Sequence, residues 1–330
     1  MDPNGVGVNN GNLFGIDCSE QDADLVIIPI PWDVTSSYGR GSSMGPQAML
    51  EASIQLDFFH PKVEKAWGKK LYMRPITQKW LDINNGYADG VQKYIAHLEN
   101  GGVLEGSEFE STVNEINIIH EQLKDDVYTQ SLALLKQNKK VAILGGEHST
   151  PLGLLQALGD VYADFAILQI DAHADLRDGY EGFQQSHASI MHHALQIESI
   201  SKIVQVGVRD LSPNERQFIE DNDRVETIFD WDLAEEQFAG LRWKHQVKRI
   251  VERLPGMVYI SFDIDGLEPS NCPNTGTPVP GGLSYNQAIY LIQEVKAVGK
   301  TIVGFDLCEV APGLPINAIT GARVLWELCL

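Results

Sequence analysis

The chain contains little cysteine: it has four cysteines in 330 residues, and none of them form a CxxC pair. Small secreted folds held by disulfides carry a much higher density, so free thiols and a reducing compartment are expected. The sequence also lacks an apolar run of about 18 residues and a basic, then apolar, amino-terminal leader. These absences predict a cytoplasmic protein that does not interact with a membrane.

Basic residues are also scarce. The chain has 25 Lys and Arg against 45 Asp and Glu, which gives a formal net charge of −20. Such a charge repels nucleic acid phosphates and anionic membranes, so we expect no nucleic acid partner. The charge serves solubility first, and by the same physics it attracts metal ions and cationic small molecules.

Strand-like apolar runs alternate with helical stretches from residue 141 onward. The expected strands cover residues 25–30, 141–144, 165–170, 203–208, 225–229, 257–262 and 301–305. This alternation predicts an α/β fold with three α/β/α layers around a mostly parallel sheet. No break in composition marks a second domain, so residues 1–330 are expected to form one domain.

Two segments do not fit this rhythm. Residues 1–15 are rich in Gly and Asn and are expected to form a mobile arm. Residues 58–111 combine aromatic and polar side chains without a clear period. We interpret them as an insertion that covers the site or forms an oligomer contact.

Three expected strands are followed by residues that commonly bind metals. Alternate residues of an extended segment point to the same side, and open α/β sheets bind ligands at the carboxyl ends of their strands. Any one of these groups could cap a helix or hold a loop. Together they predict a metal centre, whose ligands would be His148, Asp171, His173, Asp175, Asp263 and Asp265.

Six ligands, some of them bridging, suit two divalent cations about 3.5–4 Å apart. Oxygen-rich ligation with some imidazole favours Mn²⁺ over zinc, and nickel is compatible with the same ligands. A single-zinc deacetylase with an Asp-x-His motif is an alternative. Asp175 and the pair Asp263 and Asp265 favour two metals instead.

Two further residues are candidates for catalysis. His187 ends the loop that leaves the first cluster, and an imidazole suits acid–base work at neutral pH, although His187 could instead cap the next helix. Glu309 follows the last expected strand. A carboxylate there could pair both oxygens with a planar guanidinium group.

Four motifs resemble those of the ureohydrolases, the family of arginase, agmatinase and guanidino-acid hydrolases. They are GGEHS at 145–149, DAHADLRD at 171–178, SFDIDGLEP at 261–269 and DLCEVAP at 306–312. The resemblance implies an arginase-like fold, a binuclear manganese site on the same six residues, and a homo-oligomer, either trimer or hexamer. It also implies that His187 transfers protons, Glu309 binds guanidinium and Asp175 orients the nucleophile.

Residues 175–191 are most similar to agmatinases, so the expected reaction is hydrolysis of agmatine to putrescine and urea, in polyamine metabolism. Glu268 stands where the family usually has Asp, and Ser43-Met44 replace its usual Arg before Gly-Pro. These departures leave other substrates open: guanidinobutyrate, arginine, guanidine or formiminoglutamate. A metal-binding regulator without catalysis is the non-enzymatic alternative.

Overall fold

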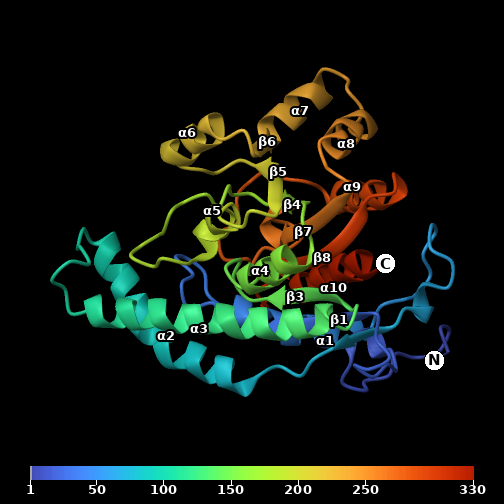
Figure 1. Cartoon of the computed structure of the whole chain (residues 1–330), viewed down its shortest axis with the longest axis horizontal. Coiled ribbons are helices and arrows are strands. Elements are labelled where there is room, and N and C mark those ends of the chain that lie inside the picture. Colours follow the sequence, from blue (N-terminus) through green and yellow to red (C-terminus); the bar gives the residue numbers. More distant parts are fainter. Residues whose placement is uncertain (1) are drawn as a thin grey trace.

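A parallel sheet of eight strands forms the centre of the structure, a computed structural model that describes residues 2–330 (Figure 1). The strands are β1 (Leu25–Ile30), β2 (Leu71–Met73), β3 (Lys140–Gly145), β4 (Phe165–Ile170), β5 (Ile200–Val208), β6 (Val225–Phe229), β7 (Met257–Asp263) and β8 (Thr301–Cys308). Their order across the sheet is β2-β1-β3-β8-β7-β4-β5-β6. All strands therefore end at the same edge of the sheet.

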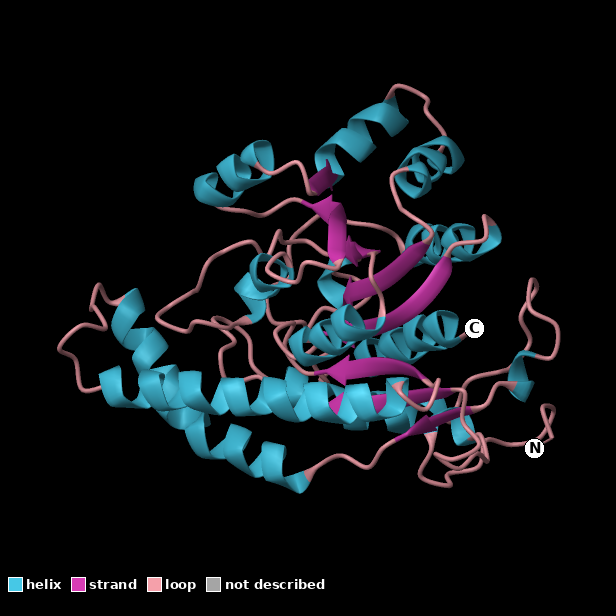
Figure 2. Cartoon of the chain, in the orientation of Figure 1, coloured by secondary structure: helices cyan, strands magenta, loops and turns pink. Residues whose placement is uncertain are grey.

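Helices enclose this sheet on both faces (Figure 2). They are α1 (Gly45–Ser53), α2 (Gln78–Glu99), α3 (Glu110–Leu135), α4 (Leu152–Val161), α5 (Ile190–Ala194), α6 (Pro213–Asp221), α7 (Asp230–Phe238), α8 (Trp243–Glu252), α9 (Tyr285–Ala297) and α10 (Pro315–Cys329). Within residues 2–330, none of these helices is both long and apolar enough to cross a membrane.

Each face of the sheet buries its own hydrophobic core. On β4, Ala166, Leu168 and Ile170 belong to one core, whereas Phe165 and Ile167 belong to the other. Helices α1 and α7–α10 cover the first core, and α2–α6 cover the second. Because successive strand residues point to opposite faces, a strand buried on both sides is apolar throughout. The predicted three-layer α/β/α fold is confirmed.

The structure adds three elements that the sequence did not predict: β2, α2 and α7. β2 has only three residues, which is too short to show a period. α2 contains Asn84, Asn85 and Gly86 in its middle, and these are poor helix formers. Packing overrides this propensity: Asn84 is fully buried, and its Oδ1 accepts a hydrogen bond of 2.7 Å from the backbone N–H of Asp33.

Residues 58–111 are integrated into the fold through β2, which pairs with β1, and through α2. Helices α2 and α3 form a long hairpin along one side of the molecule (Figure 1). That this segment is an insertion stays a prediction.

The α2–α3 hairpin holds the loop of residues 176–187. Tyr94 donates a hydrogen bond of 2.8 Å from Oη to the carbonyl oxygen of Glu181. Asn117 donates from Nδ2 to the carbonyl oxygen of Gly182 at 3.1 Å and accepts at Oδ1 from the N–H of Gln184 at 2.9 Å. The hairpin thus positions the loop that ends in His187.

The end of the predicted mobile arm is anchored to the core. Residues 12–15 are buried, and Leu13–Gly15 form a short 3₁₀ helix. The N–H of Phe14 donates to Ser53 Oγ at 2.8 Å, and its ring meets that of Trp326 with centroids 4.8 Å apart. An arm of about 15 residues is therefore too long, because Leu13 and Phe14 are buried in the hydrophobic core, where Phe14 contacts α1 and α10.

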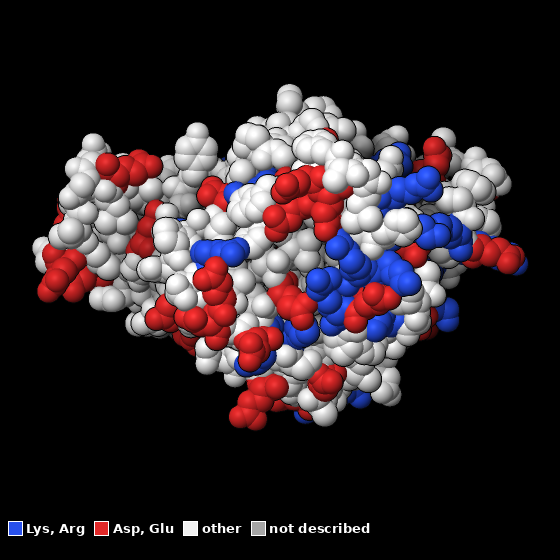
Figure 3. Space-filling view, turned by 90° about the horizontal axis from the view of Figure 1, so that it is seen from above, with Lys and Arg blue, Asp and Glu red and all other residues white. Residues whose placement is uncertain are grey.

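Charged side chains cover the β6 edge of the sheet. Viewed from the side of α6, α7 and α8, acidic and basic side chains lie next to one another (Figure 3). Arg253 Nε lies 2.7 Å from Oε2 of Glu226 on β6. Lys202 of β5 forms an ion pair with the same carboxylate. Charges at an exposed edge discourage pairing with strands of other molecules.

Asn117→Ala should loosen the loop of residues 176–187. The substitution removes two hydrogen bonds, each worth about 0.5–1.5 kcal/mol, so local opening should become about tenfold more frequent. Hydrogen exchange at the Gln184 amide measures this directly. Asn114→Ala is the matched control, because Asn114 is an exposed residue one turn earlier on α3. Equal exchange in both variants would contradict a positioning role for Asn117.

Candidate metal centre

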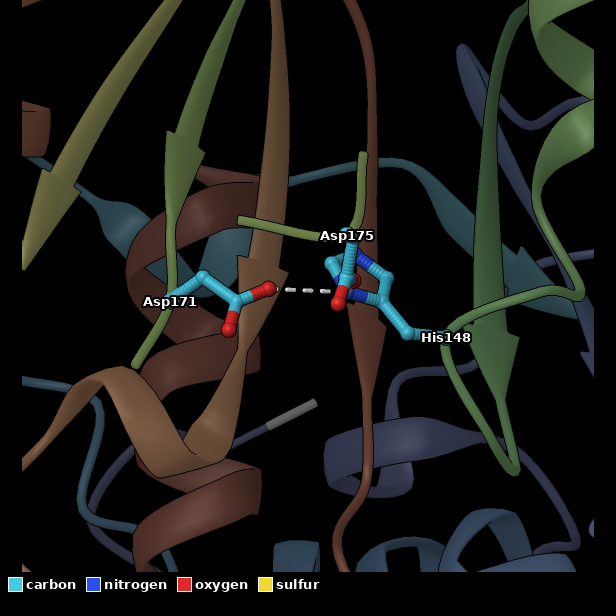
Figure 4. A group of neighbouring side chains, drawn as sticks. All are labelled: His148, Asp171 and Asp175. Atoms are coloured by element: carbon cyan, nitrogen blue, oxygen red, sulfur yellow. Dashed lines mark ion pairs between the residues drawn. The ribbon is translucent and has the colours of Figure 1, made fainter. Parts of the chain in front are cut away.

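Three of the predicted ligands surround one ring nitrogen. His148 follows β3, and its Nδ1 lies 3.0 Å from Asp171 Oδ2 and 3.0 Å from Asp175 Oδ2. These three side chains point toward one another from the ends of β3 and β4 (Figure 4). Asp263, at the end of β7, places Oδ2 3.5 Å from the same nitrogen. One imidazole and three carboxylates thus converge on one point.

A second cluster adjoins the first. His173 Nδ1 lies 3.1 Å from Asp265 Oδ2 and 3.7 Å from Asp171 Oδ1. Asp171 therefore turns one oxygen toward each histidine, and the two potential metal-binding groups share it. The structure brings all six predicted ligands together, and their arrangement suits two cations with Asp171 between them.

Backbone N–H groups fix the orientation of the carboxylates. Asp171 Oδ1 accepts from the N–H of His173 at 2.7 Å, and Asp263 Oδ1 accepts from the N–H of Asp265 at 2.8 Å. Asp265 Oδ1 accepts from the N–H of Ala172 at 3.0 Å. In Asp263 and Asp265 this leaves Oδ2, the oxygen that faces a histidine, available to a cation.

A hydrogen-bonded chain orients His148 from behind. Ser261 Oγ donates to Asp306 Oδ2 at 2.8 Å, and it lies 2.8 Å from His148 Nε2. Because the single hydroxyl hydrogen of Ser261 goes to Asp306, the imidazole must donate from Nε2. In the neutral ring, Nδ1 then carries the lone pair with which a histidine binds a metal.

The residues fit divalent cations. His148 Nδ1 is buried and makes no hydrogen bond among the residues that the structure describes, although it faces three carboxylates. Burial and the neighbouring Asp171 raise the pKa of Asp175 to about 7. Burial and Asp265 raise the pKa of Asp263 well above its usual value. Carboxylates this close cannot all ionise without added positive charge, which cations would supply.

His187 lies on the same cavity as the second cluster. This cavity of about 160 Å³ is lined by His173, Asp175 and His187, among others. His187 Nε2 lies 3.3 Å from Ser37 Oγ. Burial, and to a lesser degree the nearby His173, lower the pKa of His187 to about 4. His187 also begins a 3₁₀ turn, but the preceding Ser186, not His187, provides its cap. This position places the imidazole beside the metal ligands.

Glu309 lies behind the metal ligands. Its Oε1 accepts a hydrogen bond of 3.0 Å from the N–H of His148. A Cβ added to Gly276 would lie 3.4 Å from Oε2, so the loop at Gly276 covers the carboxylate closely. Burial and the neighbouring Glu147 raise the pKa of Glu309 well above its usual value. The structure thus connects Glu309 to the ligand backbone, and its contact with a guanidinium group stays a prediction.

The backbone is strained at two of these residues. Asp175 has φ of 55° and Glu309 has φ of 64°, a region that favours glycine. Such strain persists only where the surrounding structure enforces it, and it concentrates at functional sites. Gly146 is needed for a different reason, because a Cβ there would lie 2.1 Å from the carbonyl oxygen of Trp32.

Four supporting residues escaped the sequence analysis. Ser261 and Asp306 orient His148, and Ser261 could have been found because it precedes Asp263 by two residues on one strand. Glu147 is fully buried and accepts hydrogen bonds from Thr35. Arg209 Nη2 donates to the carbonyl oxygens of Asp265, Leu267 and Val279, and nothing in the sequence marks those long-range bonds.

The comparisons with known proteins agree with this geometry. The model of the arginase family matches residues 23–330. The N(1)-aminopropylagmatine ureohydrolase of Thermus thermophilus is 30% identical over 319 residues, covering 94% of this chain and 91% of the relative. The agmatinase of Halalkalibacterium halodurans is 27% identical, covering 92% and 89%.

Solved structures show the same fold. The crystal structure of the agmatine ureohydrolase of Thermoplasma volcanium has a TM-score of 0.70 at 25% identity and covers 95% of this chain and 91% of that chain. The arginase of Bacillus subtilis has a TM-score of 0.65 at 18% identity, covering 92% and 98%.

The chain therefore belongs to the arginase family. The prediction of an agmatinase-like ureohydrolase, a hydrolase that acts on C–N bonds of amidines, is confirmed. The dependence of this family on two metal ions agrees with the two groups of ligands that share Asp171.

Ser261→Ala should weaken metal binding. Without the hydroxyl, His148 Nε2 loses its orienting partner, and losses of this kind cost about 10–100-fold in metal affinity or activity. Titration of the metal-free protein with Mn²⁺, followed by counting of bound metal, measures the change. Ser201→Ala is the control, because Ser201 lies at the opposite end of the sheet. Unchanged affinity in Ser261→Ala would refute the orienting role.

Proposed function

We propose that this protein hydrolyses agmatine to urea and putrescine at a centre of two manganese ions. The observation that supports the proposal is the pair of ligand groups that share Asp171, with His187 on the adjoining cavity. The relatives named agmatinase or agmatine ureohydrolase support the choice of substrate. The oxygen-rich ligand set supports manganese.

The residues would have distinct roles. His148, Asp171, His173, Asp175, Asp263 and Asp265 hold the cations, which when bound supply a water of lowered pKa as the nucleophile. Asp175 lies on the cavity and orients that water with its carboxylate. His187, which is neutral near pH 7, accepts a proton released by the attacking water and passes it to the leaving amine.

Glu309 would align the substrate. Its buried carboxylate lies beside His148, and burial raises its pKa. A bound guanidinium group would supply a positive charge that stabilises the ionised carboxylate. The departing group is then an amine, and the remaining carbon leaves as urea.

A longer substrate is the second candidate. The relative at 30% identity is named for N(1)-aminopropylagmatine, which carries an additional amine. Asp210 is exposed on the rim of the cavity and its carboxylate could pair with such an amine. We further propose that the protein is cytoplasmic and forms a homo-oligomer, a trimer or a hexamer, as its resemblance to the family implies.

Urea release from the Mn²⁺-loaded protein tests the proposed substrate. Agmatine should be the preferred substrate in a panel with N(1)-aminopropylagmatine, arginine, guanidinobutyrate and guanidine. Formiminoglutamate is included with formamide release as the readout. Preference for the aminopropyl compound would support the second candidate, whereas turnover of none of them by protein with two metals bound would refute a guanidino or formimino hydrolase.

His187→Asn should lower kcat by about 100-fold or more while both metals stay bound, because a positioned acid–base group contributes about 10²–10⁴-fold. Metal content and kcat are measured on the same sample. His245→Asn, an exposed histidine on α8, is the control and should keep full activity. Full turnover of His187→Asn would exclude this residue from proton transfer.

A further inference from the structure

A second cavity lies at the opposite end of the sheet from the metal centre. It has a volume of about 400 Å³, and its lining includes the first residues of four neighbouring strands, Leu25, Leu71, Lys140 and Thr301. Parallel strands begin at this edge and end at the metal centre. The cavity is therefore separate from the candidate active site.

Five lysines line this cavity, in a chain with only 25 Lys and Arg and a net charge of −20. They come from three stretches of the chain that the fold brings together, and the only carboxylate side chain among the lining residues is that of Asp24. The lysines are Lys69, Lys70, Lys140, Lys296 and Lys300. Their concentration makes this cavity a positive region on an acidic protein.

Helix ends explain part of this cluster. Lys296 Nζ donates to the carbonyl oxygen of Glu327 at 2.7 Å, and Lys69 Nζ donates to that of Leu330 at 2.8 Å, both at the end of α10. Lys300 Nζ donates to the carbonyl oxygen of Leu254 at 2.6 Å, just beyond α8. Cations near a helix carboxyl terminus are stabilising, so these three lysines have structural roles.

Lys70 and Lys140 have no such role. Across residues 2–330, no hydrogen bond or ion pair involves the amine of either side chain. Both side chains are exposed, and both line the same cavity as the three capping lysines. Helix capping therefore leaves two lysines at the cavity unexplained.

The lysines also repel one another. Burial lowers the pKa of Lys296 to about 8, and the nearby Lys69 and Lys140 act in the same direction. Partial desolvation of the Lys140 amine beside the cavity walls, and to a lesser degree the nearby Lys69, lower the pKa of Lys140 as well. A bound anion would relieve this repulsion.

We propose that this cavity binds a small anion that carries phosphate. Ammonium groups bind phosphate as point charges, and they can approach from several directions. Each lysine has three N–H donors, so Lys69, Lys296 and Lys300 keep donors for a ligand after capping the helix ends. The volume of the cavity lies within the range of small-molecule sites. The buried side chains of Leu71 and Phe305 form part of its apolar lining.

Equilibrium dialysis of the metal-loaded protein against radiolabelled pyrophosphate tests this site. Saturable binding is expected, and Lys70→Gln/Lys140→Gln should weaken it at least tenfold. Displacement of the label by both glycerol 3-phosphate and orthophosphate would assign organic phosphates to the site, and displacement by orthophosphate alone would assign inorganic phosphate. Lys70→Gln alone should give a severalfold loss, which keeps the test available if the double variant does not fold.

Lys93→Gln/Lys136→Gln is the matched control. Both lysines are exposed and lie outside the cavity. Replacing them changes the net charge by the same amount as Lys70→Gln/Lys140→Gln. Because pyrophosphate also binds metals, any binding at the metal centre should be equal in the two double variants. Equal affinity in the unmodified protein and both variants would therefore overturn the proposal, as would an absence of saturable binding to the unmodified protein. The test reads binding alone, so its outcome does not depend on urea release.

Discussion

Repulsion among buried carboxylates is the constraint around which this structure is arranged. Asp171 and Asp175 follow β4, Asp263 and Asp265 lie at the end of β7, and all four are buried. Burying like charges together is costly unless cations compensate them. The parallel strands end at one edge and so bring these carboxylates together. Backbone N–H groups near the strand ends each hold one oxygen of Asp171, Asp263 and Asp265 in place.

The parts of the chain around the centre keep it rigid. β8 supplies Asp306, which orients Ser261 on the neighbouring β7 and thereby His148 at the end of β3. The α2–α3 hairpin fixes the loop before His187 through Tyr94 and Asn117. Residues distant in the sequence thus determine the geometry of the ligands. A hydrolase benefits from such preorganisation, because charged groups that are already in place need no rearrangement during the reaction.

The two ends of the sheet differ in charge. Carboxylates gather at the candidate metal centre at the carboxyl ends of the strands, whereas the amino ends of β1, β2, β3 and β8 surround a cavity lined by five lysines. In a chain of net charge −20, five of the 25 Lys and Arg residues lie at this one cavity. The two regions therefore differ in the ligands they favour, cations at one end and anions at the other.

The sequence by itself determined the fold class and the candidate ligand set. Apolar runs alternating with helical stretches are local patterns, so seven of the eight strands and the six candidate ligands at their ends could be predicted from them. The tertiary structure alone decided the rest. Ser261 and Asp306 meet only because β7 and β8 pair in one register, and Arg209 reaches Asp265 only across a folded loop. α2 forms despite Asn84, Asn85 and Gly86 because its contacts are with distant residues. Those contacts depend on pairings that no local pattern encodes, which is why the sequence did not reveal them.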